Sequence, residues 1–380
     1  MADFNFLSMS LKEIFCQDKA ISILQKAFAS GKVPHAYIFA GPEGVGKFKT
    51  AREWARLLLC EHPAAENRIS DGCGSCQSCR LFEAGSHPDF NLVYKELREF
   101  TRDGKGKPPP VDLPIDVIRE FLIEKVATRP TLSQRKAFII SEAEKLNIAS
   151  QNSLLKILEE PPEYCSIILL CTRLEGLLPT TKSRCQIIRF GLIAENRIVQ
   201  NLKQIGIDSQ KAQYFSRLAQ GSLGLACQWA QLELADANLY KTKKELVSSI
   251  SAYEYADSLN LAQQFLEQSR KIAAVWADLD KTTSKTDISR RAAKTVVQII
   301  ISALYDAMKM NVTPEKELIN FDQTEHIKKL AERFAPELAA GKIADMYKTT
   351  RWIDSAVNEK LIFEQLLLNL AVSDIMNVSQ

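Results

Sequence analysis

The stretch AYIFAGPEGVGK, residues 36–47, decides the fold expected for this chain. It begins as a short apolar run typical of a strand and continues into a glycine loop of the form G-x-x-x-x-G-K. Residues 47–60 follow with helical spacing of apolar side chains. A strand, a glycine loop and a helix are the setting of a phosphate-binding loop, because glycines let backbone N–H groups face an anion at a helix N-terminus. The candidate nucleotide-binding residues are Gly41, Gly44, Gly46 and Lys47.

The position after the loop lysine departs from this pattern. A working loop carries Ser or Thr there, and its hydroxyl completes the coordination shell of Mg²⁺. This chain has Phe48, which offers no oxygen. Thr50 is three residues beyond Lys47 and faces another way on a helix, so we do not expect it to replace the missing ligand.

A second departure follows the candidate strand at residues 136–141. The usual pattern there is Asp near the metal and then Glu, which orients the attacking water. Here the two residues are Ser141 and Glu142. Both losses concern the same ion, so we expect Glu142 to be vestigial, ATP and Mg²⁺ to bind weakly or not at all, and hydrolysis to be poor.

The order of elements predicts an α/β domain followed by helices alone. Candidate strands alternate with helices over residues 35–190, which indicates a parallel sheet with helices on both faces. Within this part we expect a polar loop over 61–88 and a helix over 144–162 that stops at a double proline. Beyond Phe190 helical periodicity dominates. The predicted domains are residues 1–190 with a metal-binding insertion at about 60–80, a small helical domain at 191–238 and a larger one at 239–380.

Composition sets broad limits on function. The chain has 380 residues and a net charge of +3, too small to indicate a nucleic-acid-binding protein by itself. The N-terminal residues lack the pattern of a signal peptide, and no apolar run reaches the roughly 18 residues of a membrane span. Nine unevenly spaced cysteines do not resemble a secreted disulfide framework, so we expect a cytoplasmic protein.

Four cysteines predict a metal site. Their spacing is C-x12-C-x2-C-x2-C, and four thiolates can close a tetrahedral zinc site. An iron–sulfur cluster would call for a fourth cysteine soon after the close triplet, whereas Arg80, Leu81 and Phe82 follow it here. Three unligated cysteines so close together in a polar segment would have no packing role. Structural zinc is therefore the favoured interpretation over both alternatives, with the ligands Cys60, Cys73, Cys76 and Cys79.

Arg184 lies in the segment SRC, just before a candidate strand at the rim of the sheet. From the residues alone, the simpler hypothesis is a surface arginine in a salt bridge. The alternative is an arginine finger, supplied in trans to the γ-phosphate bound by a neighbouring subunit.

Taken together, these stretches resemble bacterial DNA polymerase III clamp-loader subunits of the AAA+ class. The resemblance covers residues 1–235 well and extends weakly to the end through residues 358–370. The stretches that carry it are PHAYIFAGPEGVGK (34–47), the cysteine pattern, SHPDF (86–90), SEAEKLNIASQNSLLKILEEPP (141–162), CT (171–172) and SRC (183–185).

The resemblance implies an assembly and several site roles. It implies a hetero-pentameric ring with gamma/tau and delta subunits, which uses ATP to open the sliding clamp and place it on primer–template DNA. Thr172 would be the sensor residue, and Arg184, flanked by Ser183 and Cys185, would be the trans-acting finger. The four cysteines would bind zinc, the small helical domain would be a lid, and the last domain would form an oligomerising collar.

The departures distinguish two subunit types within that family. An ATP-hydrolysing gamma/tau motor should have Ser or Thr after the loop lysine, Asp-Glu after the second strand, and an Arg in the lid segment G-S-L-R. This chain has Phe48, Ser141 and Gly224 at those positions but keeps SRC. That profile favours the delta-prime type, with little or no ATPase activity of its own. A gamma/tau-type motor remains the alternative, and a zinc-containing DNA-binding protein that acts alone is a third hypothesis.

Overall fold

The computed structural model describes residues 10–66, 69–105, 110, 112–281, 283–354 and 358–377. The sequence predicts helix over residues 1–34, and the first nine of these residues lie outside the described part of the chain. Contacts divide the chain into two compact units. One extends to Ile193 and includes Ser222–Gly224, and the other holds Ala194–Gly221 and the residues from Leu225 onward. The three-domain division expected from the sequence stays a prediction.

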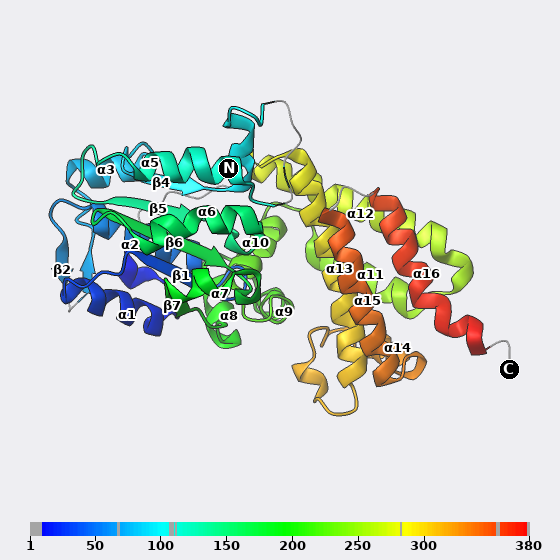
Figure 1. Ribbon diagram of the computed structural model, residues 1–380. Helices are drawn as coiled ribbons and strands as arrows, with labels where there is room; N and C mark the ends of the chain where they lie inside the picture. The colour runs from blue at the N-terminus through cyan, green and yellow to red at the C-terminus, as the bar shows by residue number, and fades with distance from the viewer. Residues whose placement is uncertain are drawn as a thin grey trace. The chain divides into compact units, whose positions relative to one another are not determined.

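The first unit is built on a five-stranded parallel sheet, which confirms the predicted α/β architecture (Figure 1). The strand order is β4-β5-β6-β1-β7, so β1, which precedes the glycine loop, lies between β6 and β7. In this register Ile38 is opposite both Leu169 and Ile187. The strands are β1 (Ala36–Ala40), β4 (Phe90–Val93), β5 (Lys136–Ile140), β6 (Cys165–Cys171) and β7 (Gln186–Arg189).

Each face of the sheet has its own hydrophobic core. Tyr37 and Phe39 point into the core shared with α1 (Asp18–Ala29) and α2 (Lys47–Leu59). Ile38, between them, points into the core on the opposite face. Both faces are therefore covered, and the inner strands β1, β5 and β6 are buried along their whole length, as expected for a parallel sheet. At the edge, β7 buries only one of its four residues.

The opposite core is closed by two helical segments. A continuous helix there consists of α4 (Ile115–Ile118), a π turn (Arg119–Ile123) and α5 (Glu124–Val126). The second segment is α6 (Ile148–Glu159). Shorter elements of this unit are the 3-10 turns Leu11–Glu13, Lys95–Phe100, Ala143–Lys145 and Leu174–Gly176, and helix α7 (Pro179–Ser183).

Two local predictions are wrong in part. The helix expected over 144–162 begins only at Ile148, because the Asn147 side chain accepts a hydrogen bond from Ser150 N at 2.8 Å and caps it there. The polar segment expected to be a loop over 61–88 contains a hairpin and a helix. These are β2 (Ala64–Glu66), β3 (Ile69–Asp71) and α3 (Gln77–Glu83).

The second unit is helical, which confirms the all-α part of the predicted fold. Its longest helix, α13, packs against α12, α14 and α15, and α12 also packs against α16. None of the described helices is long and apolar enough to cross a membrane. The helices are α8 (Glu195–Gln204), α9 (Ser209–Leu218), α10 (Leu223–Leu234), α11 (Leu239–Ser251), α12 (Ser258–Leu279), α13 (Lys285–Lys309), α14 (Thr324–Arg333), α15 (Pro336–Asp354) and α16 (Glu359–Asn377).

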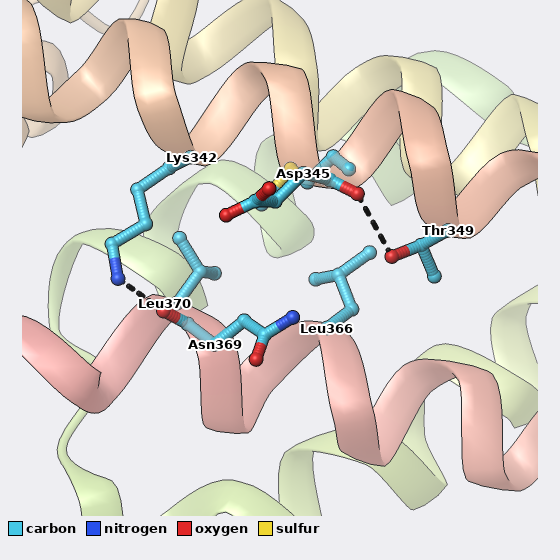
Figure 2. A pocket seen from close by; sticks show the side chains of 7 residues that line it. Lys342, Asp345, Thr349, Leu366, Asn369 and Leu370 are labelled. Carbon is cyan, nitrogen blue, oxygen red and sulfur yellow. Dashed lines mark hydrogen bonds between the residues drawn. The ribbon is translucent and has the colours of Figure 1, made fainter.

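Helices α15 and α16 meet around a small hollow (Figure 2). Leu366 and Leu370 of α16 line it, and Lys342 of α15 donates a hydrogen bond across it to the backbone carbonyl of Asn369. The hollow is too narrow to admit a water molecule, so it is a packing detail and not a binding site.

Candidate functional site

The glycine loop has the backbone form that the sequence predicts. It joins the end of β1 to the start of α2, and Gly46 caps that helix in the left-handed conformation, with φ of 100°. The amide of Gly41 donates to the carbonyl of Cys171 at 3.2 Å, which ties the loop to the end of β6. The helix N-terminus thus lies at the edge of the sheet formed by the carboxyl ends of the strands, where α/β proteins place their ligands.

Lys47 is folded back onto the loop. Its Nζ donates to the carbonyls of Gly41 and Pro42, each at 2.5 Å, and the residue is buried. Burial lowers the pKa of Lys47, and this shift is opposed by nearby carboxylates, foremost that of Glu144. The ammonium group that would bind phosphate is therefore satisfied by the loop's own oxygens.

The two side chains after Lys47 serve packing. Phe48 is half-buried and packs against the hydrophobic core that α1 and α2 share with the sheet. Thr50 is buried, and its hydroxyl donates to the carbonyl of Gly46 at 2.9 Å. The Thr50 hydroxyl is thus engaged by a backbone carbonyl, and the Phe48 side chain carries no oxygen.

The end of β5 is likewise engaged in contacts within the protein. Ser141 Oγ donates to the carbonyl of Val93 on the neighbouring strand at 3.3 Å. Glu142 has a positive φ of 50° and an exposed side chain. Its carboxylate pairs with Lys145 and, at 3.7 Å, with Lys95. The Glu142 carboxylate, which we expected to be vestigial, thus pairs with two lysine side chains of the same chain.

Glu144, which sequence analysis missed, has a stronger electrostatic effect on Lys47 than Glu142 has. Its Oε1 accepts hydrogen bonds from the backbone N–H and the hydroxyl of Thr172, at 3.2 and 2.5 Å. The predicted sensor residue therefore donates its hydroxyl to a carboxylate of this chain. The only signal in the sequence was a second acid two positions after Glu142, and its partner lies 28 residues away.

Gly224 contacts the glycine loop directly. Its N–H donates to the carbonyl of Gly44 at 2.8 Å. A Cβ added at Gly224 would lie 2.8 Å from Gly44 Cα, a distance that backbone atoms do not tolerate without a shift. At the position where the motor type carries an arginine, the backbone of Gly224 thus lies directly against the backbone of Gly44.

Arg184 caps the C-terminus of α7 and forms an ion pair. Its Nη2 lies 2.6 Å from the Glu159 carboxylate, and its Nη1 donates to the carbonyl of Thr180 at 3.0 Å. The flanking residues are anchored, since Ser183 Oγ also donates to the Thr180 carbonyl and Cys185 packs against the core. Burial raises the pKa of Cys185 to about 12, so this thiol stays protonated.

The four predicted cysteines do come together. Their sulfur atoms all lie within 4.8 Å of one another, and the Sγ atoms of Cys60 and Cys76 are 3.9 Å apart. Tetrahedral zinc with Zn–S bonds of about 2.3 Å places its ligands about 3.8 Å apart, so the cluster fits a four-thiolate ion with little adjustment.

Backbone donors surround these sulfur atoms. The N–H groups of Cys73, Cys76 and Cys79 each lie 3.3 Å from the sulfur of another cluster cysteine. Around Cys73 burial opposes ionisation, but N–H and hydroxyl donors, first those of Ser75, outweigh it and lower the pKa of its thiol to about 6. Burial raises the pKa of Cys79, which is fully enclosed. Donors of this kind stabilise metal-bound thiolates.

Two polar networks, which the sequence did not reveal, hold this cysteine module in place. Arg56 of α2 is buried between Glu53 at 2.8 Å and Asp71, at the end of β3, at 3.2 Å. The carboxylate of Asp89, fully buried, accepts three backbone N–H bonds of 2.7–2.8 Å from residues 131–133. A hydrogen bond of 2.8 Å joins His87 Nε2 to Ser78 Oγ of α3. The SHPDF segment is thus structural here.

Two protein-family models match this chain, one over the sheet domain and one over the C-terminal helices. The family model "DNA polymerase III, delta subunit" matches residues 16–193, and "DNA polymerase III, delta subunit, C terminal" matches residues 255–371. The chain belongs to the delta-prime, tau and gamma family of DNA polymerase III clamp-loader subunits. Between them the two matched ranges include the glycine loop, the cysteine module and most of the long C-terminal helices.

Three relatives illustrate the range of this clamp-loader family. "DNA polymerase III subunit delta'" of Pseudomonas aeruginosa is 38% identical over 40% of this chain and 41% of that protein. "DNA polymerase III subunit tau" of Bacillus subtilis is 31% identical over 61% of this chain and 37% of that protein. The delta' subunit of Bacillus subtilis is 24% identical over 96% and 99%. The chain thus matches less than half the length of the first two relatives.

Proposed function

We propose that the chain is the delta-prime subunit of the DNA polymerase III clamp loader and helps to load the sliding clamp onto primed DNA. One observation carries the choice of subunit type. The three positions that serve nucleotide chemistry in a motor subunit are used here for internal contacts: Phe48 in the core, Ser141 on a backbone carbonyl, and Gly224 against Gly44. The site retains its backbone and Lys47 but lacks the metal-supporting side chains and the lid arginine that a motor subunit would use.

Arg184 would act in trans. Its side chain is one-third exposed at the end of a short helix, and its carboxylate partner Glu159 is half exposed. Such an exposed pair contributes little to stability, so a stronger anion can replace Glu159 at low cost. The γ-phosphate of ATP on a neighbouring motor subunit is such an anion, and an arginine there stabilises the charge of the transition state. Ser183 and Cys185 would fix the backbone on either side.

The cysteine module would hold structural zinc. All four ligand positions come from the protein, so no position is left for a substrate. The ion would pin together the end of α2, the hairpin and α3. Bound zinc would keep the thiolates ionised, and the surrounding N–H groups support that state.

The proposed partners follow from the family. They are gamma/tau and delta subunits in a hetero-pentameric ring, the sliding clamp, and primer–template DNA reached through the complex. The second, helical unit would form the lid and the oligomerising collar. The protein would work in the cytoplasm, at the nucleoid-associated replisome.

The ATPase activity of the reconstituted ring tests this proposal. We expect Arg184→Ala to lower DNA- and clamp-stimulated turnover by about tenfold or more, since an arginine finger contributes about 10³-fold or more at the site it serves. Arg173→Ala, which removes an exposed arginine eleven positions earlier, is the matched control and should leave turnover unchanged. Normal ATP turnover by a ring that carries Arg184→Ala would contradict the assignment of Arg184 as an arginine finger.

The gamma/tau motor remains a second candidate, because the glycine loop and Lys47 are retained and a tau relative is 31% identical over 232 residues. It predicts Mg²⁺-dependent ATP turnover by the isolated chain that Lys47→Ala abolishes. The delta-prime proposal predicts that ATP turnover by the isolated chain does not exceed that of a control with buffer alone. A purified sample with about one equivalent of bound zinc is the proper material for this assay.

A further inference from the structure

A continuous chain of hydrogen bonds links Lys47 to Glu144. Lys47 Nζ donates to the carbonyl of Gly41, and the amide of Gly41 donates to the carbonyl of Cys171. The next residue, Thr172, donates both its N–H and its hydroxyl to Glu144 Oε1. The Glu144 carboxylate therefore lies at the same edge of the sheet as the glycine loop, on the side of the predicted sensor.

The second oxygen of this carboxylate has a distinct environment. Glu144 Oε2 is buried and has no hydrogen-bond partner among the described residues. Glu144 is also the strongest of the charges that raise the pKa of Lys47 against the effect of burial. A half-buried carboxylate with one buried oxygen, within electrostatic reach of the loop lysine, partly cancels the positive charge on which phosphate binding depends.

We propose that Glu144 excludes nucleotide phosphate from the glycine loop. It would do so in two ways, by repelling the phosphate charge and by occupying the hydroxyl of Thr172. This inference rests on the proposed function and deepens it. The losses at Phe48 and Ser141 would remove magnesium support, whereas Glu144 would be a repulsive group that acts on the phosphate itself.

Other acids near the loop are less suited to this role. Glu142 is neutralised by Lys145 and Lys95. Glu43 and Glu175 are both exposed, so water screens their charges. Glu144 alone among these four combines a buried oxygen with a hydrogen bond to Thr172.

Calorimetric titration of the full-length chain with ADP and with inorganic pyrophosphate tests the proposal, with and without Mg²⁺. Glu144→Gln removes the charge but keeps an oxygen for Thr172, and it should bind both ligands at least about tenfold more tightly than wild type. Glu144→Ala should also bind more tightly. Glu175→Gln removes an exposed carboxylate nearby and should stay within about twofold of wild type.

Each result has a distinct meaning. Tighter binding in both Glu144 variants, with an unchanged Glu175 variant, supports the proposal. Weak binding by wild type and by both Glu144 variants overturns the role of Glu144 and leaves the proposed function, which the Arg184 assay tests, untouched. Tight ADP binding by wild type contradicts both this inference and the degenerate site. An equal gain in all three variants also overturns the inference, since it would show a general charge effect.

Discussion

Helix α2 has a different kind of site at each end. At its start, the glycine loop keeps its backbone while Phe48 and Lys47 turn to internal contacts. At its end, Cys60 gathers with three other cysteines, and every predicted ligand is in place. Thirteen residues of helix, about 20 Å, separate the two sites.

The difference shows what holds each site together. The glycine loop lies against a large hydrophobic core, and Phe48 and the contact of Gly44 with Gly224 hold it there. The cysteine module has a short hairpin and one short helix, with few apolar side chains. We propose that a segment with so little core gains much of its stability from its metal ion, and we therefore expect the two ends of α2 to respond differently to mutation.

Removal of one cluster cysteine should have the largest effect. Cys76→Ser should reduce bound zinc from about one equivalent to nearly none and lower Tm by about 10 °C, because the module would then lose the ion that we propose joins its parts. Zinc content by atomic absorption and thermal unfolding by circular dichroism measure this. Cys227→Ser, outside the cluster, is the control and should keep its zinc. A wild-type protein that contains no zinc and has the same Tm as Cys76→Ser would contradict the proposed difference between the two ends of α2.

The buried carboxylate that anchors the module comes next. Asp89→Asn should cost about 2–3 kcal/mol at pH 7, because the replacement amide turns a donor toward backbone N–H groups. Chemical denaturation measures the loss. Asp278→Asn, at an exposed position, should leave the unfolding midpoint unchanged.

This effect should depend on pH. Burial raises the pKa of Asp89, but three backbone donors outweigh it, so the folded-state pKa lies below the ordinary 3.8. The advantage of wild type over Asp89→Asn should therefore be complete above about pH 4 and shrink as the pH falls through the lowered pKa. A gap between the two proteins that stays constant down to pH 2 would argue against a charged Asp89.

At the other end of α2, the contact between the two glycines should have an effect of intermediate size. Gly224→Ala should cost about 1–3 kcal/mol, because its Cβ would meet the backbone of Gly44 at 2.8 Å. Gly341→Ala is the matched control: it lies inside α15 with open space around it and should stabilise by up to about 1 kcal/mol. Equal stability of the two variants would show that the loop does not need this contact.

The smallest effect is expected at Phe48. Phe48→Ser restores the hydroxyl of a working loop, yet ATP turnover by the isolated chain should stay at the buffer level, because Ser141 and Gly224 are unchanged. Stability should fall by about 1 kcal/mol through lost packing. Phe100→Ser, at a position 70% exposed, should cost less. Turnover gained by Phe48→Ser alone would mean that the site is much closer to a motor than we propose.

Local patterns predicted the sheet and the glycine loop well. The strands at 36–40 and 136–140 are short segments dominated by apolar side chains, and the loop has a fixed glycine spacing. The paired strands β2 and β3 and helix α3 escaped prediction, because a short polar segment rich in Cys, Gly and Ser has no hydrophobic periodicity. Their positions depend on buried charges such as Arg56, which only the folded chain brings to Asp71.

The candidate site was predictable where one motif contains all its members. The four cysteines were found in this way, although Cys60 precedes the others by a hairpin. The partners of Thr172 and Arg184 were not predictable, because Glu144 and Glu159 lie on other segments and their side chains meet only through the register of β5, β6 and β7. The contact of Gly224 with Gly44 spans 180 residues, and no local pattern specifies it.

Strand β7, which directly follows Cys185, forms an edge of the described sheet and leaves three of its four residues exposed. An edge strand offers unpaired backbone groups to any other strand that approaches, so it is a starting point for aggregation. Arg189 places a charge on this edge, and a charge there disfavours unwanted pairing. Arg189 would therefore help to keep the separate chain from aggregating, although it has no part in either site of α2.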